Sequence, residues 1–241
     1  MAAEKLDILA FAAHPDDAEL ACSGTLLKHV KQGKKVGVVD LTQGDLGTRG
    51  TVDIRMKEAE DSAKILGLTV RENLKMPDGF FEETNENLLK IISAIRKYKP
   101  EIVLANAVED RHPDHGRGGK IVSRACFLSG LRRIETRADG EIQQPWRPKN
   151  VYHYIQFRYI KPDFVVDISG EWEQKVAAIK AFKSQFYNPE SDEPATLIAS
   201  ENFMRYIEAR ALEMGSVGEV KYGEGFTVER PILVNDLFNL G

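Results

Sequence analysis

Cysteine is scarce in this chain, which has only Cys22 and Cys126 among 241 residues. The two form no Cys-x-x-Cys pair and stand at no metal-ligand spacing from a histidine, which excludes a cysteine-based metal site. We therefore expect both to be small apolar core residues. Such sparing use of cysteine fits a reduced, cytoplasmic setting.

Long apolar runs and an excess of basic charge are also missing. No stretch approaches the ~20 residues of a membrane helix, and no signal-peptide pattern is present, so no membrane partner is expected. The formal net charge of −4 argues against a dedicated nucleic-acid binder, which usually shows a basic face. The motifs of a phosphate loop, a dinucleotide site and a nucleophilic serine elbow are absent as well.

What the chain does have is an alternation of strand-like and helix-like segments, within a length that suits one domain, 1–241. Apolar runs predict strands at residues 6–13, 35–41, 68–74, 102–107, 151–157 and 164–168. Helical patterns cover residues 18–32, 52–66, 85–98, 171–187 and 200–214, and residues 135–150 and 188–195 are expected to be loops. This alternation predicts an α/β fold: a Rossmann-like, mostly parallel sheet with helices on both faces and the active site at the C-terminal strand ends.

Three of the five histidines lie in two similar motifs, His14-Pro-Asp-Asp17 and His112-Pro-Asp-His115. Both follow apolar runs that should be neighbouring parallel strands, so their side chains would face one crevice. Imidazole and carboxylate groups suit zinc, and two histidines with one carboxylate leave a position open for catalysis. Spacing alone does not say which three side chains bind, and Asp17 by itself could cap the next helix.

These paired motifs resemble the signatures of the LmbE-like, or PIG-L, family of zinc-dependent N-acetylglucosamine (GlcNAc) deacetylases. Within that family, Thr42–Asp45, Met76–Asp78, Glu109–His115 and Tyr222–Phe226 look most like the bacillithiol-pathway branch. The resemblance implies hydrolysis of the N-acetyl group of a GlcNAc conjugate, with N-acetyl-α-D-glucosaminyl L-malate as the first candidate. It also implies a homo-oligomer whose partner is a small molecule.

The resemblance assigns a role to each residue of the two motifs. It implies that His14, Asp17 and His115 bind the zinc and that Asp16 is the general base that deprotonates the attacking water. It further implies that a protonated His112 stabilises the oxyanion and passes a proton to the leaving amine, with Asp114 holding His112 in its charged form.

Substrate-binding residues are expected in and after the glycine-rich segment Gly44–Gly50, because glycines permit a close approach of backbone to ligand. Thr48 lies within this segment. By the resemblance, Arg55 is the first choice to bind a malate carboxylate in a bidentate manner, with Arg49 and Arg111 as weaker candidates. Relatives often have a tyrosine near the site. In the corresponding segment this chain has Phe203, which lacks a hydroxyl, so we assign that role neither to Phe203 nor to Tyr206.

Alternatives remain at three levels. The substrate could be another GlcNAc-containing molecule or a thiol-conjugate amide. The metal could be zinc or, in the cell, ferrous iron, because this donor set accepts both. An alternative of another class is a non-haem iron oxygenase, which also binds its metal with two histidines and one carboxylate.

Overall fold

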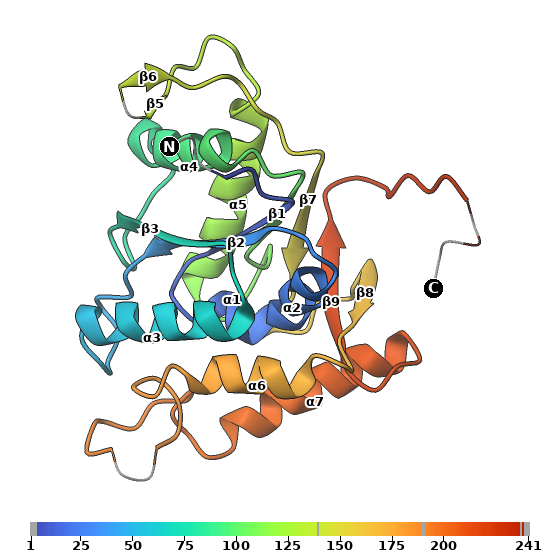
Figure 1. Cartoon of the computed structure of the whole chain (residues 1–241). Coiled ribbons are helices and arrows are strands. Elements are labelled where there is room, and N and C mark those ends of the chain that lie inside the picture. The colour runs from blue at the N-terminus through green and yellow to red at the C-terminus, as the bar shows by residue number, and fades with distance from the viewer. Residues whose placement is uncertain (1–3, 139, 189–190, 237, 239–241) are drawn as a thin grey trace.

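The computed structural model describes residues 4–138, 140–188, 191–236 and 238. Parts of three expectations lie outside these residues, namely position 139 of the predicted loop 135–150, positions 189–190 of the predicted loop 188–195 and both ends of the predicted domain 1–241. The described chain forms a twisted sheet with helices on both faces and a further helical layer beneath (Figure 1). The α/β fold expected from the alternating pattern is thereby confirmed.

The main sheet has seven strands in the order β3-β2-β1-β4-β7-β9-β8. The first five run parallel, whereas β9 is antiparallel to both of its neighbours. The strands are β1 (Ile8–Ala12), β2 (Val36–Thr42), β3 (Val70–Met76), β4 (Ile102–Ala105), β7 (Asn150–Tyr154), β8 (Phe164–Asp167) and β9 (Gly223–Val228). Because β2 and β3 extend the sheet on one side of β1 and β4 extends it on the other, strand order reverses between β1 and β4. Ligands of open α/β sheets bind at such a switch point.

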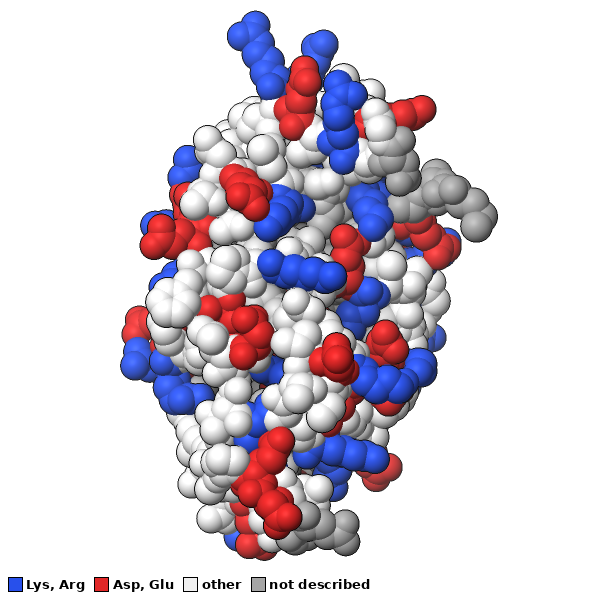
Figure 2. Space-filling model, turned by 90° about the vertical axis from the view of Figure 1, so that its left-hand side faces the viewer, with Lys and Arg blue, Asp and Glu red and all other residues white. Residues whose placement is uncertain are grey.

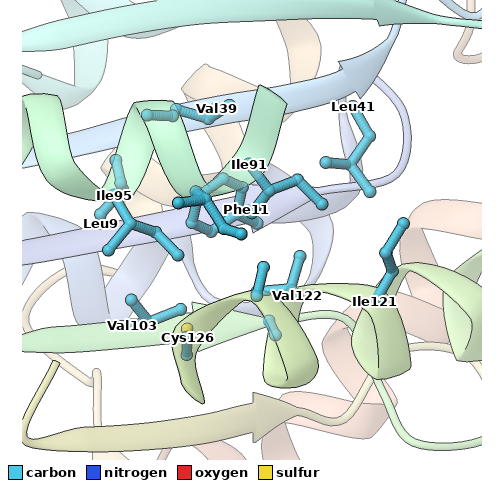
Figure 3. Packing of buried hydrophobic residues seen from close by; sticks show 14 of the residues in the cluster. Leu9, Phe11, Val39, Leu41, Ile91, Ile95, Val103, Ile121, Val122 and Cys126 are labelled. Atoms are coloured by element: carbon cyan, nitrogen blue, oxygen red, sulfur yellow. The ribbon is translucent and has the colours of Figure 1, made fainter. Parts of the chain in front are cut away.

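The helices cover both faces because the central strands are apolar on both sides. The helices are α1 (Asp17–Ala21), α2 (Ser23–Lys31), α3 (Val52–Leu66), α4 (Asn85–Tyr98), α5 (Pro113–Leu128), α6 (Trp172–Lys180) and α7 (Phe203–Val217). Leu9 and Phe11 of β1 pack with residues of α4 and α5 such as Ile91 and Val122 (Figure 3). Ile8 and Ala10 point to the opposite face, toward α1 and α2. Alternate burial along β1 therefore fixes its register between two helical layers.

Several predicted boundaries needed correction. The single helix expected at 18–32 is two helices, because Cys22 leaves helical geometry with φ −137°. The helix expected at 171–187 ends at Lys180, and the expected loop 135–150 contains a short hairpin, β5 (Arg137–Ala138) and β6 (Glu141–Ile142). Sequence reasoning missed α5 and β9 altogether. Their glycines made both elements hard to recognise as helix or strand. A Cβ at Gly119 of α5 would lie 2.7 Å from the Asn106 carbonyl oxygen, and one at Gly223 of β9 would lie 2.6 Å from Val165. Close packing therefore requires glycine at both positions.

The surface and the cysteines match the composition. Acidic and basic side chains are interspersed on the face that Figure 2 shows, with no large area of one sign. Cys22 and Cys126 are both free and buried, as expected. Among the described residues, no helix combines the length and apolar character needed to cross a bilayer.

A buried ion pair fastens α6 and β9 to the start of α2. Lys175 Nζ donates to Glu224 at 2.7 Å and to the carbonyl oxygens of Glu19 and Leu20 at 3.1 and 2.9 Å. The Glu224 carboxylate also accepts hydrogen bonds from the Gly24 and Thr25 N–H groups at 2.9 and 2.7 Å. Both charges are buried and fully engaged, so the loop that carries the first motif rests on a rigid base.

Removing one member of this pair leaves a buried, unpaired charge. We expect Lys175→Met to lower the free energy of unfolding by about 3–5 kcal/mol. Urea denaturation followed by circular dichroism measures the effect, with Lys180→Met on the exposed side of the same helix as control. A loss below about 1 kcal/mol, as for a surface pair, would show that the pair does not hold this region together.

Candidate metal centre and active site

The two histidine motifs meet where strand order reverses. β1 and β4 are adjacent and parallel, with Ile8 opposite Ile102, so the loops that follow them leave the sheet side by side. The ring centroids of His14 and His112 are 4.6 Å apart, and the His115 ring lies 5.6 Å from His14 and 5.1 Å from His112. The structure thus brings all three histidines of the motifs into one cluster.

Potential metal-ligating atoms gather in two overlapping groups. Within each, the donor atoms lie within 4.8 Å of one another, and the groups are His14, His112 and His115, and His14, Asp78 and Asp114. Asp17 joins the first group, because its two carboxylate oxygens lie 3.5 Å from His14 Nδ1 and 3.0 Å from His115 Nε2. Ligands of a tetrahedral zinc ion at ~2.0–2.1 Å lie roughly 3.3 Å from one another. The His and Asp donors of this site therefore fit a small divalent cation.

The second ring nitrogens of His14 and His115 are each engaged by a carboxylate. Nε2 of His14 lies 3.0 Å from Asp78, and Nδ1 of His115 lies 2.6 Å from Asp110. Such contacts fix the tautomer and orientation of metal-ligating histidines, and here they leave His14 Nδ1 and His115 Nε2 toward Asp17. Sequence reasoning assigned no role to Asp78 or Asp110, although both belong to segments that carried the family resemblance.

Two amide side chains hold the carboxylate of Asp17. Asn106 Nδ2 donates to Oδ2 at 3.1 Å, and Gln156 Nε2 donates to Oδ1 at 3.0 Å. The His14 backbone N–H also donates to Oδ2, at 3.0 Å. Asp17 is the first residue of α1 rather than its N-cap. Its carboxylate therefore does not cap the helix and lies instead among the histidines. Asn106 and Gln156 carried no sequence signal, because their importance comes from the loops that bring them to Asp17.

Asp16 has the most unusual backbone of the site. Its φ of 117° lies in the left-handed region, which non-glycine residues seldom adopt and which concentrates at functional sites. The carboxylate is buried and lies 3.8 Å from the Arg55 guanidinium. Burial raises the pKa of Asp16 to about 7, although the positive charge of Arg55 opposes the rise. Near neutral pH such a carboxylate can both accept and release a proton.

Asp114 is expected from the sequence to hold His112, but the hydrogen bonds of its carboxylate go to other groups. Its carboxylate accepts hydrogen bonds from the Gly79 N–H at 2.9 Å and from Arg117 at 2.7 Å, and it lies 3.4 Å from His14 Nε2. It is the Asp114 backbone N–H that contacts His112, donating to Nδ1 at 3.2 Å. The negative charge of Asp114 therefore lies beside His14, and the Asp114 main chain orients His112. Burial and the two neighbouring histidines lower the pKa of His112 more than this charge raises it.

This contact also revises the expected charge of His112. Because Nδ1 accepts this hydrogen bond, the geometry favours the neutral ring with its proton on Nε2. Burial, together with the neighbouring His14 and His115, lowers the pKa of His112. His112 lines the pocket, where the neutral ring offers one N–H donor rather than a full positive charge.

Arg55, expected to bind a substrate carboxylate, is turned inward. It is buried, and its guanidinium donates to the carbonyl oxygens of Gly44 at 2.7 Å and Pro15 at 3.0 Å. Gly44 has φ +66°, and a Cβ there would lie 1.9 Å from Arg55 Nη1, so this approach requires glycine. Arg55 thus ties the glycine-rich loop to the loop of the first motif and places its charge beside Asp16.

The remaining substrate candidates lie around a pocket of about 540 Å³ that contains the histidine cluster. Thr48 and Arg111 are exposed on its lining, and the Arg111 guanidinium lies 5.1 Å from the centroid of the Phe157 ring. Phe203 lines the pocket with a buried ring, whereas Tyr206 is exposed. The side chains of Thr48 and Arg111 are therefore exposed, whereas Arg55 lines the same pocket with a buried guanidinium.

Comparisons with known proteins agree with this geometry. The family model described as PIG-L, GlcNAc-PI de-N-acetylase, matches residues 9–126. Diacetylchitobiose deacetylase from Thermococcus kodakarensis is 31% identical over 229 residues, which are 90% of this chain and 81% of that protein. The chain belongs to the PIG-L family of metal-dependent deacetylases. Among solved structures, the conserved protein TT1542 from Thermus thermophilus has a TM-score of 0.85 at 34% identity, with 96% of this chain and 98% of that chain covered.

Membership of the PIG-L family confirms the expected hydrolytic deacetylase and removes the oxygenase alternative. The comparisons support the bacillithiol branch only weakly. A probable N-acetyl-α-D-glucosaminyl L-malate deacetylase from Bacillus anthracis is 29% identical over 134 residues, which cover 49% of this chain and 58% of that protein. The comparisons therefore establish the family and leave the substrate to be argued from the pocket.

Proposed function

We propose that this protein removes the N-acetyl group from a GlcNAc-containing small molecule, with a divalent metal ion bound by His14, Asp17 and His115. The observation that carries the proposal is the pair of contacts from Asp17 to the two histidines, at 3.5 and 3.0 Å. Asp78 and Asp110 support it, because each engages the histidine nitrogen that faces away from Asp17. Zinc is the first candidate for this donor set and ferrous iron the second.

The metal, when bound, supplies a Lewis acid that polarises the amide carbonyl and acidifies a water molecule. Asp16 accepts the proton of the attacking water, since its carboxylate is buried beside the first motif and its pKa is raised to about 7. His112 donates its Nε2–H to the carbonyl oxygen, where negative charge develops. The proton held by Asp16 then passes to the amine that leaves with the sugar.

The group attached to the amino sugar decides between two substrates. The malate conjugate needs a cation for its two carboxylates, and its expected partner Arg55 donates to Gly44 and Pro15 instead. Arg111 on the rim is the cation that remains accessible from the pocket among those proposed. A neutral GlcNAc disaccharide needs no such partner. We therefore place an uncharged GlcNAc conjugate first and the malate conjugate second.

Acetate release tests this function directly. The purified protein, with its metal content measured, is incubated with N,N′-diacetylchitobiose, the malate glycoside and free GlcNAc, and acetate is quantified. We expect turnover of at least one conjugate, with the disaccharide at the higher kcat/KM. No acetate from any of the three with metal-loaded protein would refute the proposed activity.

Substitution of Arg55 distinguishes a substrate clamp from a positioning residue. Because Arg55 acts through the glycine-rich loop and Asp16, we expect Arg55→Met to lower kcat on all substrates by one common factor, roughly 10–100-fold. Steady-state kinetics on the malate glycoside and on GlcNAc measure it, with Arg111→Met as the rim comparison. A loss confined to the malate glycoside would restore Arg55 as the carboxylate clamp.

A further inference from the structure

Two large apolar side chains stand exposed at the mouth of the metal pocket. Leu46, in the loop after β2, is 60% exposed, and Phe80, in the loop after β3, is 75% exposed. Both line the same pocket as His14 and Asp16. Burial of such side chains is favourable, so exposed ones at a pocket mouth mark a surface that a ligand can cover.

The backbone that carries these two side chains is held in place by buried carboxylates. The Leu46 N–H donates to Asp78 at 2.9 Å, and the same Asp78 lies 3.0 Å from His14. The Gly79 N–H donates to Asp114 at 2.9 Å, and the Gly79 carbonyl accepts from Arg117 at 3.1 Å. A surface side chain on a pinned backbone loses little freedom on binding, which is what a preorganised contact requires.

The two loops also contact each other. Gly79 has φ +69°, and a Cβ at this position would lie 3.2 Å from Leu46 Cδ1. Leu46 therefore lies against the turn that carries Phe80, and the two exposed side chains border the same pocket surface. Asp78 joins this surface to the metal site, because it accepts from Leu46 and contacts His14.

The arginines on this side of the pocket are engaged by other groups of the protein, which favours an uncharged ligand. Arg55 donates to main-chain carbonyls, as described above. Arg49, which also lines the pocket, donates to the Ser184 carbonyl at 2.8 Å and to Ser191 Oγ at 2.8 Å. The two buried arginines thus hold loops together, and of their guanidinium nitrogens only Arg55 Nε has no hydrogen-bond partner among the described residues.

We propose that Leu46 and Phe80 form a subsite for an uncharged group with an apolar face, attached to the amino sugar of the substrate. This inference rests on the proposed deacetylase function and names the class of conjugate that it acts on. An aryl or alkyl group and the C–H face of a second sugar ring share this chemistry. Leu46 and Phe80 are specificity residues that contact this group, while Asp78 and Asp114 position them.

The test compares glycosides that differ only in the attached group. Acetate release is measured with the methyl and phenyl glycosides of GlcNAc, N,N′-diacetylchitobiose and the malate glycoside, for the wild-type protein and for Phe80→Ala and Leu46→Ala. We expect the phenyl glycoside to have a KM roughly tenfold below that of the methyl glycoside, and Phe80→Ala to abolish this difference. The disaccharide shows whether a sugar face is bound in the same way as an aryl ring.

Phe127→Ala is the matched control, because Phe127 is 58% exposed on α5 and is not part of the pocket lining. It should leave every KM unchanged. Equal KM values for the methyl and phenyl glycosides, or a phenyl preference that survives both Phe80→Ala and Leu46→Ala, would overturn the subsite while leaving the deacetylase function intact. No acetate from any glycoside would overturn the deacetylase function itself.

Discussion

Replacing Asp16 with asparagine should lower kcat by about 10²–10⁴-fold, the range for loss of a general base, and leave the metal content unchanged. Asparagine is the informative substitution because it tolerates the left-handed backbone that Asp16 adopts, at φ 117°. It keeps the size of the side chain and removes the negative charge that takes the proton and faces Arg55. A loss of activity then reports on chemistry rather than on the fold of the loop.

Metal analysis and steady-state kinetics on the same preparation check this result. Asp45→Asn is the control, since Asp45 is an exposed acidic residue in the glycine-rich loop. An Asp16→Asn protein that holds its metal and turns over normally would show that another group accepts the proton. A protein that loses its metal would instead make Asp16 a ligand.

Replacing Asp17 with alanine should remove most of the bound metal and with it the activity. The Asp17 carboxylate lies between the two histidine nitrogens that we propose as ligands. The effect on metal affinity should exceed the 10–100-fold typical of losing a partner that only orients a ligand. Asp110→Asn provides that comparison, because Asp110 contacts His115 on the side away from Asp17.

Elemental analysis after equilibration with a weak chelator ranks the three proteins. We expect the metal content to fall in the order wild type, Asp110→Asn, Asp17→Ala. Circular dichroism checks that Asp17→Ala stays folded, since Asn106 and Gln156 lose their acceptor in this variant. An unchanged metal content in folded Asp17→Ala would remove Asp17 from the ligand set.

Local patterns were enough to predict the elements whose residues follow one clear period. The helices Val52–Leu66 and Asn85–Tyr98 have the predicted bounds, and a threonine N-cap precedes each. The first is rich in helix formers and stops at Gly67, whereas the second has an apolar stripe. The strands at the centre of the sheet were recognisable as apolar runs, since both of their faces are covered. Elements with several glycines, α5 and β9, were not recognisable, because the contacts that require glycine lie in other parts of the chain.

The site followed the same division. Adjacent residues of a motif could be read from the sequence, and the histidine motifs do meet at one edge of the sheet. Roles that depend on where a side chain points could not be predicted from the sequence. Arg55 has the residue type of a substrate clamp, but its position one turn into α3 aims its guanidinium at Gly44 and Pro15.

The sequence by itself determined the α/β class, the two motifs and the chemistry that His and Asp side chains can perform, because residue type and strand-end position are local properties. Only the tertiary structure decided which partners those side chains have. It set Asp78 beside His14 and Asp110 beside His115, directed the Asp114 N–H to Nδ1 of His112 and set Leu46 beside the turn that carries Phe80. These outcomes depend on which loops the sheet brings together, and that arrangement is settled by burial of the whole core rather than by any one segment.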